Sequence, residues 1–338
     1  MAQVEFTKAE KADISRLAAL PYDFGKLKNN TVLISGGTGF LGTLLTAVLE
    51  ERNRVFGDGI QIVSVSRRGG ESRGSVKHIA ADITEGVEAD RADYVIHLAS
   101  NTHPAQYAED PVGTVTTNII GCRNLLELAR KAGTKRFVLA SSVEIYGNCK
   151  EDPVAEDYCG YIDCNTVRAG YNESKRASES LCQAYRAQYG VDCVIARFSR
   201  VFGADRKHDT KAIAQFLDKA VSGEDIVLKS EGKQRFSYCY VADAVSGLLK
   251  VLLDGKEGEA YNISADDEGM TLGDYAKFIA SLAGKKVVFD LKNAQAGASV
   301  ASYALLDCKK LKALGWAPYY SVKSGLKATY DIKKTIQG

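Results

Sequence analysis

A tyrosine and a lysine four residues apart are the side chains whose types and spacing best suit chemistry. They are Tyr171 and Lys175, within VRAGYNESKRASES at residues 167–180, ahead of a run with helical apolar spacing. Residues four apart on a helix share one face, and an ammonium ion beside a phenol favours the phenolate, which makes a general base. A solvated helix start is the alternative. The same Tyr-x-x-x-Lys spacing also begins at Tyr22, Tyr146, Tyr319 and Tyr330.

A glycine-rich stretch, SGGTGFLG at residues 35–42, follows a short β-branched run and opens a run with helical spacing. Glycine permits a tight turn, a close approach of the backbone to a pyrophosphate, and close packing of helix on strand. The N-terminus of the helix then presents free N–H groups to the anion. Between a first strand and a first helix, this pattern predicts a dinucleotide site. The loop residues that we expect to bind are Gly36, Gly37, Thr38, Gly39, Phe40, Leu41 and Gly42.

The end of the second predicted strand indicates which dinucleotide binds. NAD sites usually place an acidic residue there for the ribose 2′-hydroxyl, whereas this chain has Ser66, Arg67 and Arg68. A hydroxyl and two cations suit a 2′-phosphate, so the sequence slightly favours NADP over NAD, unless the arginines simply face solvent. After the third predicted strand, Asp82 is placed to accept a hydrogen bond from the adenine amino group, with Ile83 beside it.

Alternating apolar strands and helices must position these residues. Strands are predicted at 31–36, 60–66, 76–83, 92–100, 136–147 and 192–203, and helices at 40–53 and 114–133, among others. Strands that are apolar throughout and separated by helices predict a parallel sheet covered on both faces. We therefore expect an α/β fold, a Rossmann-type doubly wound parallel sheet with a smaller mixed α/β lobe at the C-terminal end. The expected divisions are an N-terminal arm at 1–30, an NAD(P)-binding domain at 31–200 with a return segment near 238–253, and a substrate lobe at 201–338.

Composition and charge exclude several other classes of protein. A net charge of +2 over 338 residues leaves no electrostatic footprint for nucleic acid. No apolar run reaches the length of a membrane span, and the N-terminus lacks the apolar block of a signal peptide. Eight cysteines without Cys-x-x-Cys spacing favour free thiols, and four scattered histidines argue against a metal site. We expect a soluble cytoplasmic protein.

Several motifs together resemble one family, the extended short-chain dehydrogenase/reductases that modify nucleotide sugars. The segments that carry the resemblance are SGGTGFLG, ADYVIHLAS, PVGTVTTNIIGCRNLLELA, ASSVEIYG, YNESKRASE, CYVADAVSGLL and KLKALGWAP, which span residues 31 to 318. Within the family the chain is most similar to UDP-glucuronate decarboxylases, through VEIYG at 143–147 and RAGYNESKR at 168–176. We also expect cofactor contacts at Leu98, Ala99 and Ser100, in the HLAS run that matches the family.

The resemblance implies a role for each residue of the site. Tyr171 is the base that takes a proton from a sugar hydroxyl as hydride passes to the nicotinamide, and Lys175 binds the nicotinamide ribose and lowers the pKa of Tyr171. Ser142 hydrogen-bonds the reacting oxygen, or else packs against the nicotinamide. Glu144, where decarboxylases and 4,6-dehydratases carry Glu, can give or take a proton at carbon, unless it is a solvated strand end. Val143 cannot supply the acid that dehydration requires.

Arginines are the expected substrate contacts, although the family pattern is incomplete here. Arg168 suits the C6 carboxylate or a phosphate of the substrate, or else caps a loop. Arg200 stands where the family has an Asn that contacts the sugar nucleotide. Phe236 stands where the family has a diphosphate-binding Arg, and Arg235 is one residue out of register. The cations left to bind a diphosphate are Arg200, Arg206, Lys211 and Arg235.

The sequence therefore predicts a nucleotide-sugar enzyme that oxidises the sugar at C4 with NAD or NADP and is most like UDP-glucuronate decarboxylase. The alternatives are a nucleotide-sugar 4-epimerase, a 4,6-dehydratase or a 4-keto reductase, and, in another class, an inactive dinucleotide-binding scaffold. By resemblance we expect a homodimer joined by the helices near 114–132 and 172–189, although both helices equally suit burial within one subunit. No metal, nucleic-acid or membrane partner is expected.

Overall fold

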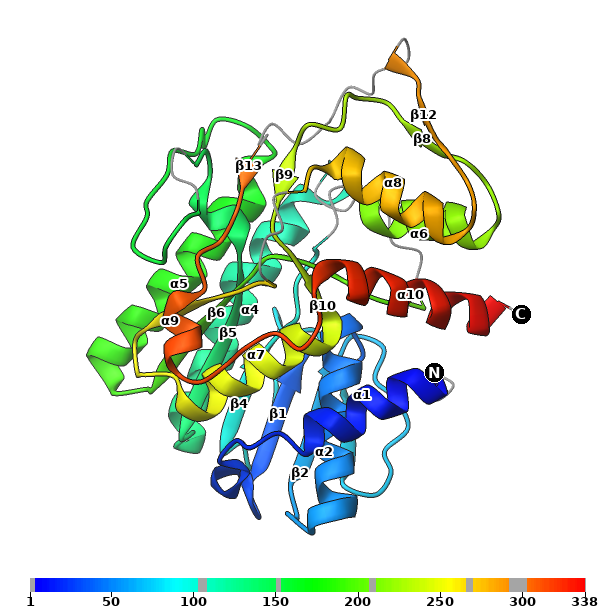
Figure 1. Cartoon of the computed structure of the whole chain (residues 1–338). Coiled ribbons are helices and arrows are strands. Elements are labelled where there is room, and N and C mark those ends of the chain that lie inside the picture. The colour runs from blue at the N-terminus through cyan, green and yellow to red at the C-terminus, as the bar shows by residue number, and fades with distance from the viewer. Residues whose placement is uncertain are drawn as a thin grey trace.

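A seven-stranded parallel sheet forms the centre of the molecule. The structure is a computed structural model of the chain and describes residues 4–102, 108–149, 153–206, 211–265, 270–291 and 303–337. The strand order is β11-β6-β5-β4-β1-β2-β3, and Figure 1 labels its five middle members from β6 to β2, so the order reverses beside β1 as it does in a Rossmann fold. The predicted fold class is confirmed. The strands are β1 (Thr31–Ser35), β2 (Gln61–Ser66), β3 (Val76–Ala80), β4 (Tyr94–His97), β5 (Arg136–Ser142), β6 (Cys193–Phe198) and β11 (Ala260–Ile263).

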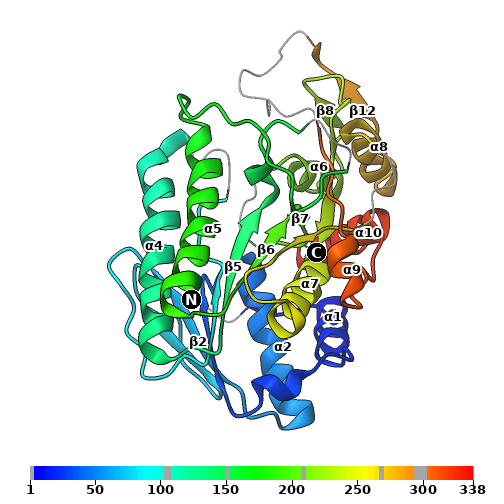
Figure 2. The same cartoon turned by 90° about the vertical axis from the view of Figure 1, so that its left-hand side faces the viewer.

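Helices cover both faces of the sheet, which is why its central strands are apolar throughout. Figure 2 shows α4 (Pro111–Ala132) and α5 (Ala169–Tyr189) side by side on one face, with α2 (Phe40–Phe56) and α7 (Val241–Asp254) on the other. The predicted stop at Gly133 is confirmed, since this glycine ends α4 in the left-handed conformation with φ of 63°. In the part of the chain that the structure describes, no helix combines the length and apolarity needed to cross a bilayer.

Most of the predicted strands are shorter than expected, including those predicted at 76–83 and 92–100, which are Val76–Ala80 and Tyr94–His97. Two further corrections bear on the site. The strand predicted at 136–147 stops at Ser142, and a 3₁₀ turn, η2 (Val143–Tyr146), follows it. The strand predicted at 192–203 is two strands, β6 and β7 (Arg200–Phe202), and β7 leaves the main sheet to pair with β10 (Tyr238–Tyr240). Apolar sequence alone does not show where a chain changes direction, because both halves remain buried.

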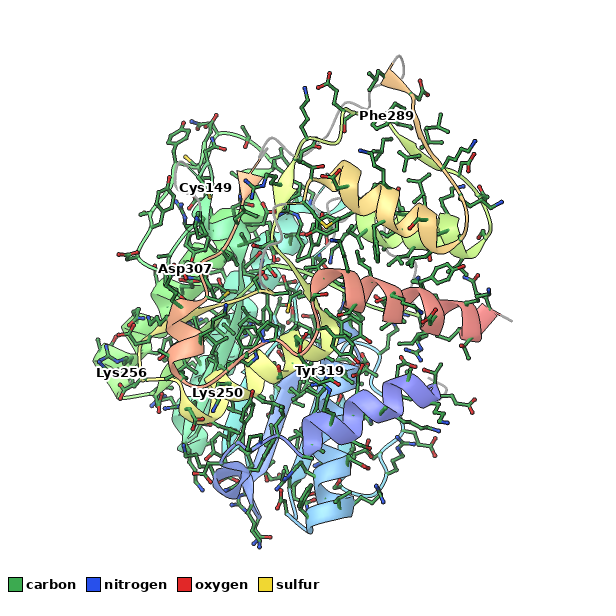
Figure 3. All side chains as sticks on the ribbon, in the orientation of Figure 1. Cys149, Lys250, Lys256, Phe289, Asp307 and Tyr319 are labelled. Carbon is green, nitrogen blue, oxygen red and sulfur yellow. The ribbon has the colours of Figure 1, made fainter. Side chains whose placement is uncertain are left out.

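The smaller lobe is less regular than the sheet domain. Its elements are α6 (Ala212–Val221), β8 (Ile226–Leu228), β9 (Arg235–Phe236), α8 (Leu272–Leu282), β12 (Val287–Phe289), β13 (Tyr303–Ala304), α9 (Lys309–Ala313) and α10 (Val322–Gln337). Strands β8 and β12 pair in parallel, as do β9 and β13. Phe289 lies at the outer end of this lobe and is 47% exposed (Figure 3). The expected lobe at 201–338 also contains β11, which instead pairs with β6 at the edge of the main sheet.

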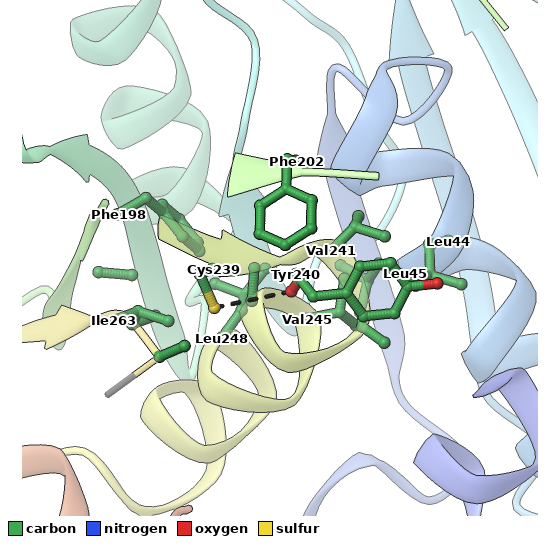
Figure 4. Close-up of a cluster of buried hydrophobic side chains, with 14 of the residues drawn as sticks. Leu44, Leu45, Phe198, Phe202, Cys239, Tyr240, Val241, Val245, Leu248 and Ile263 are labelled. Carbon is green, nitrogen blue, oxygen red and sulfur yellow. Dashed lines mark hydrogen bonds between the residues drawn. The ribbon is translucent and has the colours of Figure 1, made fainter. Parts of the chain in front are cut away.

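The hydrophobic core continues from the sheet domain into the smaller lobe. Figure 4 shows a cluster in which Val241, Val245 and Leu248 of α7 lie among buried side chains from neighbouring elements. Those side chains are Leu44 and Leu45 of α2, Phe198 of β6, Phe202 of β7 and Ile263 of β11. Because α7 returns from the lobe to the sheet, the two parts share one core.

The N-terminal arm is anchored to both parts of the molecule. Its helix α1 (Lys8–Ala18) packs against α2, α7 and α10 (Figure 1) and is followed by the 3₁₀ turn η1 (Phe24–Leu27). Buried Asp13 accepts hydrogen bonds from the hydroxyls of Tyr240 and Tyr320 at 3.0 and 2.7 Å. Glu10 forms an ion pair with Arg206, which follows β7. Arg206, one of the cations expected at a diphosphate, is therefore already bound by the arm.

Candidate active site

The glycine-rich loop forms a narrow turn between β1 and α2. Gly36 has φ of 75°, and a β-carbon added there would lie 2.8 Å from the backbone nitrogen of Ala99. A β-carbon at Gly42 would collide with the carbonyl oxygen of Gly36. Both glycines are therefore required by close packing of the turn against the segment after β4 and against its own helix. The first N–H groups of α2, from Phe40 onward, have no carbonyl partner within the helix.

This turn lies at the point where the strand order reverses, which is where α/β sheets bind ligands. β1 pairs with β2 on one side and with β4 on the other. The chain therefore leaves β1 toward one side of the sheet and later returns to β4 on the opposite side of β1. Leu98, Ala99 and Ser100 follow β4 directly, beside the glycine turn. The backbone cradle, with no room for side chains at its glycines, fits the pyrophosphate of a dinucleotide. Gly36, Gly37, Thr38, Gly39, Phe40, Leu41 and Gly42 all lie in this cradle.

Polar residues follow β2 and β3 at the same edge of the sheet. Ser66 ends β2 and is half-buried, while Arg67 and the next arginine are exposed. Asp82 accepts hydrogen bonds from the backbone nitrogen and the hydroxyl of Thr84 at 2.9 and 2.8 Å. These bonds, aided by the nearby Arg67 guanidinium, hold the pKa of Asp82 below its usual range. Ile83 is buried against Gly121 of α4. Two exposed cations and a carboxylate held by Thr84 therefore lie at the edge of the sheet where the adenosine end of a dinucleotide is expected.

Tyr171 and Lys175 occupy successive turns at the start of α5. Both are buried, with exposures of 5% and 3%, and the Lys175 nitrogen lies 5.9 Å from the centre of the Tyr171 ring. That nitrogen donates a hydrogen bond to the carbonyl oxygen of Ala140 on β5 at 2.9 Å. Burial lowers the pKa of Lys175 to about 8. Of the five tyrosines with this spacing, Tyr171 alone begins a helix that packs on β5; Lys150, the partner of Tyr146, lies outside the described residues.

Ser142 and Glu144 complete this side of the site. Ser142 is the last residue of β5, and its hydroxyl oxygen accepts a hydrogen bond from the backbone nitrogen of Glu144 at 3.2 Å. Ser141 points to the other face of the strand and donates to Glu179 of α5. Glu144 lies in the 3₁₀ turn η2 and not in the predicted strand, and Val143 beside it is buried. The turn aims the Glu144 carboxylate away from the strand axis and toward two arginines.

The two arginines are Arg168 and Arg200, which come from the residue before α5 and from β7. Their Nη2 atoms lie 3.2 and 3.5 Å from the two carboxylate oxygens of Glu144. Arg200 also stacks on the ring of Phe236, with its guanidinium carbon 3.6 Å from the ring centre. Arg235 lies next to Phe236 on β9. The structure thus brings together three of the predicted site residues that are far apart in the sequence.

Two further polar residues in the core of the site were missed by the sequence analysis. Asn118 of α4 accepts a hydrogen bond from the Ser100 hydroxyl at 2.7 Å and donates one to the Ser174 hydroxyl at 2.9 Å. It therefore links the end of β4 to the helix turn that carries Lys175. His97, the last residue of β4, lies 2.8 Å from the Ser35 hydroxyl through Nδ1. Complete burial, together with the charge of Lys175, lowers the pKa of His97 to about 3. A signal for Asn118 was available, as a polar residue on the apolar face of a predicted helix.

Comparison with known proteins identifies the family of the chain. Residues 32–264 match the NAD dependent epimerase/dehydratase family. The chain belongs to this family. UDP-glucuronic acid decarboxylase 1 of Danio rerio is 32% identical over 310 residues, which cover 88% of this chain and 71% of that protein. UDP-glucuronic acid decarboxylase 3 of Arabidopsis thaliana is 31% identical over 311 residues, covering 88% of this chain and 87% of that protein.

Solved structures of two nucleotide-sugar epimerases show the same fold. A UDP-glucose 4-epimerase from Thermotoga maritima matches with a TM-score of 0.76 and 24% identity, over 91% of this chain and 100% of that chain. A UDP-glucuronic acid 4-epimerase from Bacillus cereus, in complex with UDP-glucuronic acid and NAD, matches with a TM-score of 0.76 and 22% identity, over 90% of this chain and 99% of that chain. The predicted family is confirmed, and with it the prediction of an enzyme of NAD-dependent type.

Proposed function

We propose that the protein oxidises a nucleotide sugar at C4 and that its main activity is decarboxylation of a nucleotide-linked uronate, as in UDP-glucuronate decarboxylases. The observation that carries this proposal is the arrangement at the end of β5. Ser142 and Glu144 are joined by a hydrogen bond there, beside the helix on which Tyr171 and Lys175 lie. Ser142 suits a hydrogen bond to the reacting oxygen, and Glu144 suits a proton transfer at carbon. Tyr171, assisted by Lys175, suits removal of the hydroxyl proton.

The side chains of the site divide the proposed reaction between them. Tyr171 removes the proton of the C4 hydroxyl, the Lys175 ammonium stabilises the phenolate, and Ser142 hydrogen-bonds the C4 oxygen. The glycine loop would hold the pyrophosphate of a dinucleotide and Lys175 its nicotinamide ribose, and the bound dinucleotide would supply the oxidation of C4 and its later reduction. A ketone at C4 is β to the C6 carboxylate, so the C5–C6 bond breaks, carbon dioxide leaves, and the electron pair forms an enolate. Glu144 is placed to transfer to C5 the proton that the enolate then gains. Val143 offers no acid to expel a C6 hydroxyl, which disfavours dehydration.

A panel of nucleotide sugars tests this proposal. Purified protein is incubated with UDP-, dTDP-, CDP- and GDP-linked hexoses and uronates, with and without added NAD or NADP, and the products are identified by mass. Decarboxylation is expected to remove the mass of carbon dioxide from a uronate. An isomeric product would instead identify a 4-epimerase, and loss of water a dehydratase. Consumption of added reduced cofactor in equal amounts would identify a 4-keto reductase. No reaction with any substrate would favour a dinucleotide-binding scaffold.

We propose in addition that the protein accepts NADP at least as well as NAD. This preference is supported by Ser66 at the end of β2 and by the exposed Arg67 and Arg68 that follow it. Replacing Arg67 and Arg68 together by Ala is expected to weaken NADP binding by about 10- to 100-fold, because charge-assisted hydrogen bonds to the 2′-phosphate are lost. Calorimetric titration measures both cofactors. NAD affinity should change little, and Arg54→Ala, near the far end of α2, is the matched control. Equal affinity of the double variant and the parent for NADP would rule out this role.

The ionisation of Lys175 predicts how activity depends on pH. Its pKa is lowered to about 8, so the ammonium that stabilises the phenolate is present below that pH and is lost above it. We expect kcat/KM for the nucleotide sugar to fall above pH about 8, measured from pH 6 to 10. Lys175→Arg, whose side chain stays charged, should abolish this alkaline fall in whatever activity it retains. A profile of the parent enzyme that stays flat to pH 10 would contradict the assignment.

We propose a homodimer through α4 and α5. The structure leaves less apolar surface for it than the sequence suggested, because Leu125, Leu126 and Tyr185 are buried within the subunit. Ile120 and Tyr189 remain 41% and 47% exposed on these helices. By sedimentation equilibrium we expect twice the subunit mass for the parent and a weaker association for Ile120→Glu, which places a charge on this face.

A further inference from the structure

The N-terminal arm borders the glycine turn between β1 and α2. The arm precedes residue 32, where the match to the family begins, and its helix α1 packs against α2, α7 and α10 (Figure 1). Side chains of the arm and residues of the turn line one cavity of about 90 Å³. Its wall includes Phe6 and Glu10 from the arm and Gly39 and Phe40 from the turn. The arm is therefore a neighbour of the backbone that would hold the pyrophosphate of a dinucleotide.

Two buried carboxylates fix the arm to segments on either side of this cavity. Glu10 accepts hydrogen bonds from both Nη atoms of Arg206, and the bond from Nη2 is 2.7 Å long. The same Nη2 atom donates to the carbonyl oxygen of Glu5 at 3.1 Å. Asp13 accepts a hydrogen bond at 3.0 Å from the hydroxyl of Tyr240, the residue that precedes α7. The arm thus holds both the segment after β7 and the start of α7.

Both of these segments pack on the first residue of α2. A β-carbon added to Gly203, just after β7, would lie 2.9 Å from the tip of the Phe40 ring and 2.7 Å from Val241 of α7. Phe40 and Val241 therefore lie directly against the backbone of Gly203. Phe40 also begins α2, whose first N–H groups are the ones expected to face the pyrophosphate. Packing contacts thus run from the arm, through Arg206 and Tyr240, to the dinucleotide-binding turn.

We propose that the arm braces the glycine turn and thereby raises the affinity of the protein for its dinucleotide, with Glu10 and Asp13 as positioning residues. While the arm is docked, the segments that carry Arg206 and Tyr240 keep Phe40 and the first turn of α2 in the conformation that binds the anion. When the arm undocks, these contacts are lost, and the need to order the turn then opposes binding. The inference requires only a dinucleotide in the cradle and is independent of which sugar reacts.

Hydrogen exchange in the full-length parent protein tests this coupling without any substitution. If a docked arm favours the dinucleotide, a bound dinucleotide must favour docking by the same factor. Saturating NAD and saturating NADP, in separate experiments, are expected to slow exchange of the α1 amides by about 3- to 10-fold. The amides of α8, a helix of the smaller lobe that packs on α6 and α10, report any general stabilisation by the ligand and should slow less. Equal slowing of α1 and α8 would contradict a specific coupling.

Calorimetric titration with NAD and with NADP measures the contribution of the arm to binding. Glu10→Ala should weaken both dinucleotides by about 3- to 10-fold, because its charge-assisted hydrogen bonds to Arg206 are lost. An equal effect on both ligands distinguishes the arm from Arg67 and its neighbour, which would act on NADP alone. Ser15→Ala is the matched control, because exposed Ser15 lies on the same helix and bonds only Glu51, at 3.1 Å. It should change neither affinity.

Charge reversal separates positioning of the turn from a loss of folding. Arg206→Glu should weaken binding of both dinucleotides at least as much as Glu10→Ala, because two carboxylates then face each other. Combining Arg206→Glu with Glu10→Arg restores the ion pair and should return both affinities to within about threefold of the parent. Melting temperatures identify any variant that fails to fold. Parent-like affinities in folded Glu10→Ala protein, or α1 exchange that ignores bound dinucleotide, would overturn the inference and leave the proposed function untouched.

Discussion

Replacing Tyr171 by Phe is expected to lower kcat by about 10²- to 10⁴-fold, the range that a positioned general base contributes. Phenylalanine fills the same buried space at the start of α5 but cannot accept the proton of a sugar hydroxyl. The Lys175 ammonium, held by Ala140 at 2.9 Å, would remain in place and could still bind the cofactor ribose. Turnover is measured with whichever nucleotide sugar reacts in the substrate panel. Cofactor affinity is measured by titration and should stay within about threefold of the parent value, because the loss is in the chemical step.

A second tyrosine in the same chain provides a matched control for this prediction. Tyr330 lies four residues before Lys334 in α10, and it is 9% exposed, so it shares both the spacing and the burial of Tyr171. It lies on α10, which packs against α6, α8 and β10 and not against β5, so Tyr330→Phe should leave kcat unchanged. Turnover by Tyr171→Phe that matches the parent would remove the proposed base, and with it the assignment of Lys175 as the cation that assists it.

The narrow glycine turn between β1 and α2 could be predicted from the sequence because it depends on local requirements. Gly36 and Gly42 are needed where backbone atoms approach within a few ångströms, and such positions accept no other residue. Their place between an apolar strand and a helix start is visible in a short window of sequence. The same is true of Gly133, whose left-handed conformation ends α4. Features set by one turn and its neighbours can therefore be predicted without knowledge of the rest of the fold.

The cluster of charged side chains after β5 depends on contacts between distant segments and was harder to predict. Glu144, Arg168 and Arg200 were each singled out, but no spacing rule could place them in contact, since 24 and 56 residues separate the arginines from Glu144. The 3₁₀ turn that aims Glu144 at them was predicted as strand. Asn118 was missed for a related reason: its partners, Ser100 and Ser174, lie on other elements, so its role appears only once α4 and α5 are packed.

The contacts of the N-terminal arm could not be predicted either, because its partners are distant in the sequence. Residues 1–30 were assigned no role, and their sequence has no motif that suggests one. In the structure, Asp13 accepts hydrogen bonds from Tyr240 and Tyr320, and Arg16 stacks on Tyr319, which is marked in Figure 3, at 4.1 Å from its ring centre. Burial of Asp13 between two hydroxyls ties α1 to segments more than 200 residues away. A carboxylate in an amphipathic helix gives no sign of such partners.

A buried ion pair behind the site leads to the largest expected effect on stability. Arg197 of β6 donates to the two carboxylate oxygens of Glu179 at 3.0 and 2.7 Å, and both side chains are 12% exposed. Arg197 also donates to the hydroxyl of Tyr146 at 2.9 Å, in the turn that carries Glu144. The pair therefore supports the strand and the turn that carry Ser142 and Glu144. It raises the pKa of Arg197 above its ordinary value, so the guanidinium stays charged.

Replacing Glu179 by Leu should destabilise the protein by about 3 to 5 kcal/mol, the cost of leaving a buried charge without its partner. For a chain of this size each kcal/mol corresponds to a shift of about 2 °C, so the melting temperature should fall by roughly 6 to 10 °C. Adding Arg197→Met removes the uncompensated charge and should recover most of this loss, since a buried pair and an apolar pair of similar volume differ little in stability. Calorimetric melting of the parent, the single variant and the double variant measures both steps. A double variant no more stable than Glu179→Leu alone would mean that Arg197 acts through Tyr146 and not through its charge, because only the charge is relieved by the second substitution.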